Sequence, residues 1–206
     1  MSEDVDAADL QRDLDRIKDA MGIAERYESA PEQWLLFGIV VALGCALSQF
    51  VVLERLPGSW YLVIWFGLFG GFGGLLYWRY DGYSWAPGGG TPNVGFLILI
   101  VYAGTFAVQL VTAPFLPELG YVDETGFVLA LVLVMLGLGY LVAGETLKAY
   151  RIRNRDRRAF QAGGLLMIVL GVAIANVEPL QEWGFAAYGG TYLVYAVASY
   201  WLLTRP

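Results

Sequence analysis

The sequence of 206 residues has no histidine, a single cysteine and few charged residues. Without histidine, a Ser-His-Asp triad, an imidazole pH switch and most zinc sites lack their usual group. The lone Cys45 cannot build a disulfide framework, so we expect it to fill space as a small apolar side chain. Charged residues make up 16% of the chain, whereas an ordinary soluble domain has about 25%. Hydrophobic residues make up 57%, a composition typical of a membrane protein.

Six uncharged apolar runs have the length that a membrane-spanning helix needs. The hydrocarbon core of a bilayer is about 30 Å thick, which takes roughly 20 residues at about 1.5 Å each. The predicted spans are 34–53, 60–78, 94–112, 126–144, 160–177 and 184–203. We therefore predict an all-α integral membrane protein, with an acidic segment over 1–30 and a six-helix transmembrane domain over 31–206.

The basic residues predict the orientation of these spans. All 13 lysines and arginines except Arg55 fall on one side of the predicted membrane, and the opposite loops are acidic. Because Lys and Arg are retained on the cytoplasmic side during insertion, we expect a multi-pass protein of the cell membrane with both termini in the cytoplasm.

The segment before the first span carries more than half of the 19 acidic residues. Its apolar residues recur every three or four positions, which predicts a cytoplasmic amphipathic helix over 1–30. These residues are Ala7, Leu10, Leu14, Ile17, Met21 and Ala24. We expect Pro31 to separate this helix from the first span.

The apolar stripe of this helix has two candidate binding partners. One is a cytoplasmic protein partner, bound through residues 1–30. The other is the chain's own basic loop at 148–158, whose charge is complementary. The acidic polar face disfavours a helix lying on the bilayer. We expect no nucleic-acid partner, since the basic loop is short and tethered at the membrane.

A glycine stands five positions before a carboxamide in the first, third and fifth spans. The pairs are Gly44 with Gln49, Gly104 with Gln109, and Gly171 with Asn176. As an internal repeat, this pattern predicts three helical hairpins, at 34–78, 94–144 and 160–203. The alternative is a chance alignment, since the chain has 26 glycines.

Residues 144–177 combine a small-residue span end, the basic linker A-Y-R-I-R-N-R-D-R-R-A-F and the run G-G-L-L-M-I-V-L-G. This pattern resembles the short hairpin repeat of the six-span acid-resistance membrane protein family of bacteria, mainly over the last 60 residues. The resemblance implies a stress-associated membrane protein without an established enzymatic activity, and it carries no functional residue across.

The acidic balance also bears on the source of the chain. The isoelectric point is near 4.6, and only Lys18 and Lys148 are lysines. Because acidic surfaces stay hydrated when salt screens charge, we expect a halophilic archaeon.

Two polar features of the spans are candidates for function. The carboxamides Gln49, Gln109 and Asn176 could form a polar cluster near the outer face that lines a solute path, or they could hydrogen-bond between helices. Glu145 is the ionisable residue nearest to the membrane interior, and we expect it at the inner boundary.

Two further patterns concern helix packing. In the second span, G-x-x-x-G spacings let another helix approach closely, either from the same chain or from a second copy in a homo-oligomer. The glycines concerned are Gly67, Gly70, Gly71 and Gly74. In the sixth span, hydroxyl residues share one face, which we expect to pack inward. They are Tyr188, Thr191, Tyr192, Tyr195 and Ser199.

The sequence predicts no catalytic, cofactor-binding or metal-binding residues. We therefore expect a non-enzymatic membrane protein, a scaffold or stress-related accessory unit with a cytoplasmic interaction helix. The alternative is a small oligomeric transporter or channel for a neutral or weakly polar solute. A membrane enzyme acting on lipid is a third interpretation.

Overall fold

The computed structural model describes residues 12–13, 16–17, 23–79, 94–115, 118–146 and 154–204. Within these ranges 94% of the residues are helical and none lies in a strand. Helices suit apolar runs in a bilayer because a helix satisfies its backbone hydrogen bonds internally, where lipid offers no partner. The predicted all-α class is thus confirmed for the described part of the chain.

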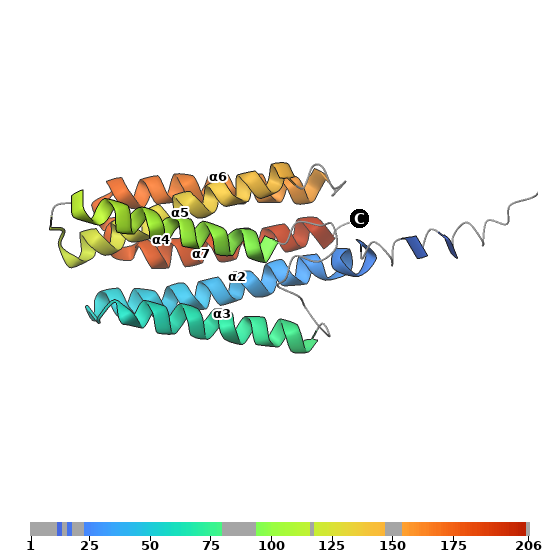
Figure 1. The fold of residues 1–206 in the computed structure, drawn as a ribbon, viewed down its shortest axis with the longest axis horizontal. Helices are drawn as coiled ribbons and strands as arrows, with labels where there is room; N and C mark the ends of the chain where they lie inside the picture. The colour runs from blue at the N-terminus through green and yellow to red at the C-terminus, as the bar shows by residue number, and fades with distance from the viewer. Residues whose placement is uncertain are drawn as a thin grey trace, which may run out of the picture.

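The helices run roughly along one common direction (Figure 1). They are α2 (Ile23–Leu53), α3 (Ser59–Arg79), α4 (Val94–Thr112), the 3-10 turn η1 (Ala113–Phe115), α5 (Tyr121–Thr146), α6 (Asn154–Asn176) and α7 (Glu178–Thr204). Four stretches are long and apolar enough to cross a membrane: Trp34–Leu53 of α2, and the helices α3, α5 and α6. A shorter apolar stretch, Leu99–Phe115, covers most of α4 and η1.

Helices α5 and α6 begin earlier than the apolar runs alone predict. Helix α5 starts at Tyr121 instead of residue 126, and α6 starts at Asn154 instead of residue 160. The first turns contain Asp123 and Glu124 in α5 and Asp156 in α6. Acidic side chains there interact favourably with the positive end of the helix dipole, so the helices extend beyond their apolar stretches.

Helices α6 and α7 are separated by Val177 alone, where the sequence predicts an outer loop. Pro179 is accommodated in the first turn of α7, where its missing N–H costs no helical hydrogen bond. The helix then deviates at Trp183, with φ −100° and ψ 16°. Regular helix resumes at Gly184, where the sixth span was predicted to begin.

Helix α2 continues through Pro31, so the predicted break at this residue is wrong. The fixed φ of proline is compatible with a helix, and the cost is one lost backbone hydrogen bond and local strain. Most of the predicted amphipathic helix lies outside the described residues, as do the linker 80–93 and residues 147–153 of the basic loop.

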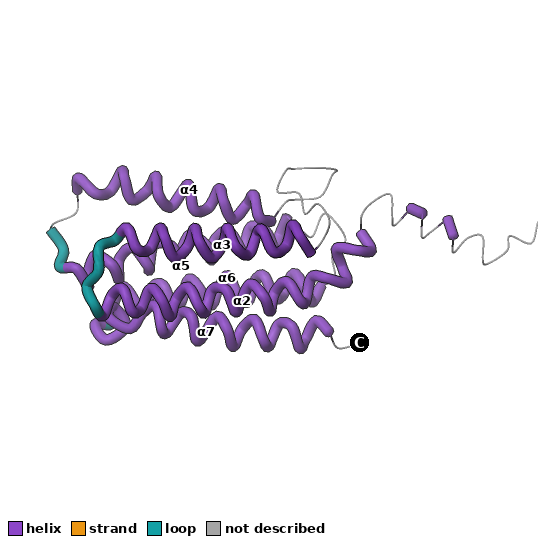
Figure 2. The backbone as a smooth tube through the Cα atoms, turned by 90° about the horizontal axis from the view of Figure 1, so that it is seen from below, coloured by secondary structure: helices purple, strands orange, loops and turns teal. Residues whose placement is uncertain are grey.

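The helices form a core with two peripheral members. The most extensive contacts join α5 to α6 and α2 to α7, and α7 also packs on α5 and α6. Helix α3 packs on α2, and α4 packs on α5. Figure 2 shows α4 at the edge of the bundle. The helices of each predicted hairpin are in contact: α2 with α3, α4 with α5, and α6 with α7. The two largest interfaces, however, join helices of different hairpins.

Small residues allow the closest helix contacts. A Cβ added at Gly164 of α6 would lie 2.7 Å from the carbonyl oxygen of Gly137 on α5. One added at Gly38 of α2 would overlap the Cβ of Ala196 on α7. Without a hydrophobic force between helices in lipid, such close van der Waals packing is a main source of association.

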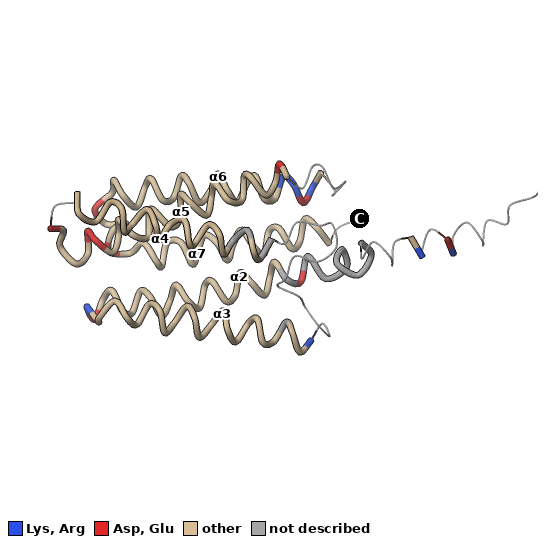
Figure 3. The backbone as a smooth tube through the Cα atoms, viewed as in Figure 1, with Lys and Arg blue, Asp and Glu red and all other residues tan. Residues whose placement is uncertain are grey.

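Charge and apolar surface are distributed as a bilayer requires. Charged residues gather at the two ends of the bundle, and the described stretches of helix between the ends carry few charged residues (Figure 3). Large apolar side chains point outward along the helices, with Phe66 75% and Trp78 80% exposed. In water such a surface would be unusual, whereas lipid covers it without cost.

Candidate functional site

The predicted polar cluster separates into three unlike environments. Gln49 is buried, and its Nε2 donates to the carbonyl oxygen of Glu182 at 2.8 Å. Its Oε1 accepts from the backbone N–H of Ala186 at 3.0 Å. These bonds hold α2 to α7 on both sides of the deviation at Trp183. Gln49 thus hydrogen-bonds between helices, which was the alternative to lining a solute path.

The other two carboxamides lie elsewhere on the bundle. The side chain of Asn176 is exposed and donates to the carbonyl oxygen of Val172, one turn earlier in its own helix, at 2.7 Å. The side chain of Gln109 is half-buried on α4. Within the described ranges, no hydrogen bond joins any two of these carboxamides.

The glycines of α3 face open space. A Cβ added at Gly67, Gly70, Gly71 or Gly74 would meet no atom within 4 Å. Packing of this face against a second copy therefore stays a prediction. The glycines that do accept a neighbouring helix lie on α2, α5, α6 and α7. Among them, Gly44 and Gly171 belong to the predicted glycine–carboxamide pattern.

Two other residues that the sequence singles out lie on α2 and α5. Cys45 is completely buried and free. Glu145 is exposed in the last turn of α5, where its Oε1 accepts a hydrogen bond from Gln161 Nε2 at 2.8 Å. The expected burial of Cys45 is confirmed. The place of Glu145 at the inner membrane boundary stays a prediction.

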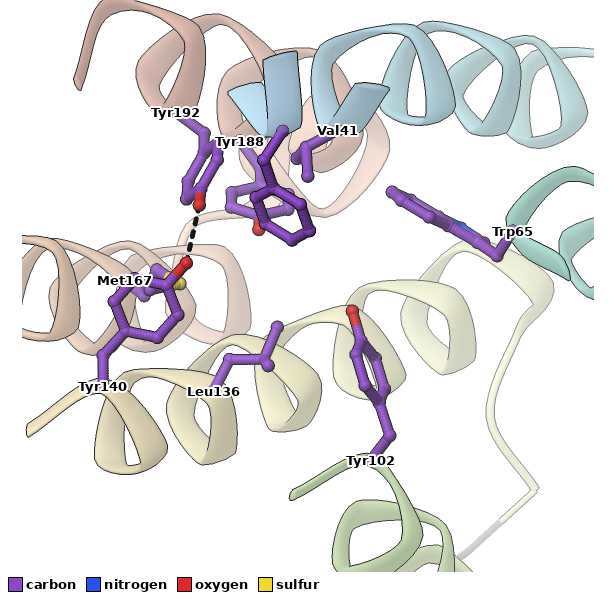
Figure 4. Close-up of a pocket in the computed structure, with 9 residues that line it drawn as sticks. Val41, Trp65, Tyr102, Leu136, Tyr140, Met167, Tyr188 and Tyr192 are labelled. Atoms are coloured by element: carbon purple, nitrogen blue, oxygen red, sulfur yellow. Dashed lines mark hydrogen bonds between the residues drawn. The ribbon is translucent and has the colours of Figure 1, made fainter. Parts of the chain in front are cut away.

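The inward face predicted for α7 leads to the most distinctive interior site. Tyr188, Tyr192 and Ser199 are buried, and Thr191 and Tyr195 are half-buried. Tyr188 and Tyr192 line a small cavity between helices α2 to α7 (Figure 4). Its other lining residues are Phe37 and Val41 of α2, Trp65 of α3, Tyr102 of α4, Leu136 and Tyr140 of α5, and Met167 of α6. We call this space the tyrosine cavity.

Hydroxyl groups from three helices are directed toward the tyrosine cavity (Figure 4). The hydroxyls of Tyr140 and Tyr192 are 2.7 Å apart and share a hydrogen bond between α5 and α7. The hydroxyl of Tyr102 points into the cavity from α4. The hydroxyl of Tyr188 points into it from α7, which also carries Tyr192. None of the described residues that line the cavity is charged.

Aromatic rings build the walls around these hydroxyls. Phe69 stacks on Trp65 with ring centroids 5.5 Å apart and on Phe37 at 5.9 Å, which fixes α3 against α2. Tyr188 and Tyr192 are 5.6 Å apart. Aromatic pairs contribute about 0.5–1.5 kcal/mol each beyond the area they bury, so the cavity walls are firmly held.

A second aromatic cluster lies next to the cavity. Trp34 of α2 packs edgewise on Phe160 of α6 at 4.8 Å, on Tyr195 of α7 at 5.8 Å and on Tyr140 of α5 at 6.1 Å. The Tyr195 hydroxyl donates to the carbonyl oxygen of Ala159 at 2.6 Å. One tryptophan therefore joins all four core helices.

The size of the tyrosine cavity limits its chemistry. It leaves about 10 Å³ for the centre of a water molecule, which is room for one such molecule. Aromatic faces can hold an organic cation, but a quaternary ammonium group needs far more space. The arrangement can therefore bind one small uncharged molecule through hydroxyl groups.

Comparisons with protein-family models, with curated proteins and with solved structures find no match to this chain.

Proposed function

We propose that the chain spans the cell membrane six times, with α4 and α7 as the third and sixth spans and both termini in the cytoplasm. The long apolar helices and the charged ends of the bundle support this arrangement. The side of the membrane follows from the basic residues, since only Arg55 lies on the outer side. Three consecutive hairpins are compatible with the contacts between α2 and α3, α4 and α5, and α6 and α7.

Within this arrangement the protein serves as a non-enzymatic scaffold or stress-related accessory unit that presents a cytoplasmic interaction helix. The observation that carries this proposal is the interior, which is filled by interlocking aromatic and small side chains from four core helices. Such packing makes a rigid platform. The stress-related role follows from the family resemblance of the sequence alone.

The interaction helix is proposed to bind a cytoplasmic protein. Ile17 belongs to its apolar stripe, and 54% of its surface is exposed. Arg16 and Asp13 form a weak ion pair at 3.9 Å that is also exposed. The predicted apolar stripe with an acidic opposite face suits a partner helix that has an apolar stripe and basic flanks.

Cross-linking in cells tests this proposal. Leu14→Asp places a charge in the apolar stripe and should abolish the cross-links of full-length protein to its cytoplasmic partner. Asp15→Ala on the polar face is the matched control and should keep them. An identical set of cross-linked proteins for wild type, Leu14→Asp and a chain lacking residues 1–30 would contradict a partner at this helix.

A second candidate function is passage of a small neutral or weakly polar solute, because the tyrosine cavity puts hydroxyl groups inside the bundle. Vesicles that contain the wild-type protein would then swell in glycerol faster than lipid alone, and Tyr188→Phe, which removes one hydroxyl from the tyrosine cavity, would reduce the difference. The scaffold proposal expects equal swelling rates for protein-containing and protein-free vesicles.

A further inference from the structure

The tyrosine cavity has hydrogen-bonding groups that its own side chains do not use. Each tyrosine hydroxyl has one donor and two acceptor sites. Tyr140 and Tyr192 bond to each other. The hydroxyls of Tyr102 and Tyr188 point into the same space from α4 and α7, and neither bonds to another described group. A buried hydroxyl without a partner costs about 1–3 kcal/mol.

We propose that the tyrosine cavity binds a single water molecule, held between the hydroxyls of Tyr102 and Tyr188 beside the Tyr140–Tyr192 pair. The space suits water in size, since about 10 Å³ is open to its centre. It also suits water in chemistry, because a buried water requires two to four polar partners and the cavity supplies several hydroxyl oxygens.

This water connects a peripheral helix to the core. Helix α4 has its main contacts with α5, whereas Tyr188 belongs to α7. A water that accepts from one tyrosine and donates to the other bridges α4 and α7 across the cavity. A bridging water is nearly as favourable in enthalpy as a direct hydrogen bond, so it helps to fix the position of α4.

Radiolytic labelling of the full-length protein in lipid nanodiscs tests the site. An X-ray pulse ionises a bound water, which loses a proton to leave a hydroxyl radical. This radical adds to the sulfur of the nearest methionine, and dissolved oxygen takes the second electron as a proton leaves, which gives the sulfoxide. Met167 lines the cavity and is only 2% exposed, so bulk radicals do not reach it. Met135 lies on α5 outside the cavity and is the internal comparison. With a radical scavenger in the bulk solvent, Met167 should be oxidised several-fold faster than Met135.

Matched tyrosine variants show which hydroxyls hold the water. Tyr102→Phe and Tyr188→Phe keep the rings and remove one hydroxyl each, so each should lower the oxidation rate of Met167 toward that of Met135. Tyr195→Phe removes a hydroxyl that bonds to Ala159 instead, and it should leave the Met167 rate unchanged.

Either of two results would overturn the proposal. One is an oxidation rate of Met167 in the wild-type protein that does not exceed that of Met135. This result does not depend on the folding of any variant. The other is a fast Met167 rate that persists in both Tyr102→Phe and Tyr188→Phe. Partner binding and solute passage play no part in this measurement, so its failure would leave the proposed function untouched.

Discussion

Arg55 holds a left-handed backbone conformation at the end of α2, with φ 50°. The N–H of Leu56 bonds to the carbonyl oxygen of Val51 at 3.0 Å, and the N–H of Arg55 bonds to that of Val52 at 3.1 Å. This pair of bonds is the Schellman motif, in which glycine is the usual residue at this position. The Tyr121 hydroxyl reinforces the turn, lying 3.2 Å from the Val51 oxygen and 3.0 Å from the Leu56 oxygen.

Replacing Arg55 by glycine should therefore stabilise the protein. A left-handed residue with a Cβ costs roughly 1–2 kcal/mol, part of which the greater entropy of glycine in the unfolded chain offsets. We expect the free energy of unfolding to rise by up to about 1 kcal/mol, seen as a higher melting temperature in detergent. Arg55→Ala removes the charge but keeps the strain, so an equal rise in that variant would contradict the explanation.

Gln49 and Gln109 occupy equivalent sequence positions but differ in their contacts. Gln49→Leu removes two hydrogen bonds to α7 and leaves the Ala186 N–H without its acceptor on Gln49. We expect this variant to lose about 1–2 kcal/mol in unfolding free energy. Gln109→Leu should change it by less than about 0.5 kcal/mol, because its side chain is half-buried on the peripheral α4. Denaturation in mixed micelles measures both, and equal losses would be inconsistent with the contacts.

The residues of the tyrosine cavity show where sequence patterns stop being informative. The inward face of α7 is visible in the sequence because Tyr188 and Tyr192 share a face of one helix with other hydroxyl residues. Tyr102 and Tyr140 stand singly in apolar runs, and nothing local tells an inward tyrosine from one that anchors a helix at the membrane surface. Their convergence depends on which helices are neighbours, and that is a property of the tertiary packing.

At the scale of elements, the length of an apolar run predicts where a helix occurs. It does not predict which other helices that helix packs against. Helix α4 has the predicted bounds, and α3 differs from its prediction by one residue at each end. The glycine pattern of α3 predicts close packing, yet its face is open, while single glycines of α5 and α6 meet directly. A G-x-x-x-G spacing describes a shape that can accept a helix, and the helix that uses it depends on the rest of the bundle.

Two matched glycine substitutions distinguish the packed contact between α5 and α6 from the open glycine face of α3. Gly164→Ala on α6 would place its Cβ 2.7 Å from the Gly137 carbonyl oxygen, which forces α5 and α6 apart. We expect a loss of about 1–3 kcal/mol in unfolding free energy. Gly71→Ala on α3 meets no atom and should be neutral or stabilising by up to about 1 kcal/mol, since alanine favours helix.

Thermal unfolding of the two variants in one detergent gives the comparison. A melting temperature for Gly71→Ala as low as that for Gly164→Ala would mean that the α3 face is packed, for instance against a second copy. Repeating the measurement over a range of protein concentrations would identify that case, because a dimer becomes more stable as the concentration rises.

For the whole molecule, the charged ends and the apolar middle are compatible with a bundle whose long axis crosses a membrane, and the basic residues predict the direction of the crossing. Glu118 precedes α5 at one end of the bundle, and Asn154 begins α6 at the other. A cysteine in place of Glu118 should react with an impermeant maleimide added to intact cells, and one in place of Asn154 should not. The native Cys45 is completely buried, so the wild-type chain is an unlabelled background.

Permeabilised cells supply the control, since the cysteine at position 154 should then react as readily as that at position 118. Labelling at both positions in intact cells would mean that the bundle does not separate two compartments. Labelling at position 154 alone would place the basic loop outside, against the retention of Lys and Arg on the cytoplasmic side. Because α5 alone joins the two ends here, the result depends on one membrane crossing and not on the total number of spans.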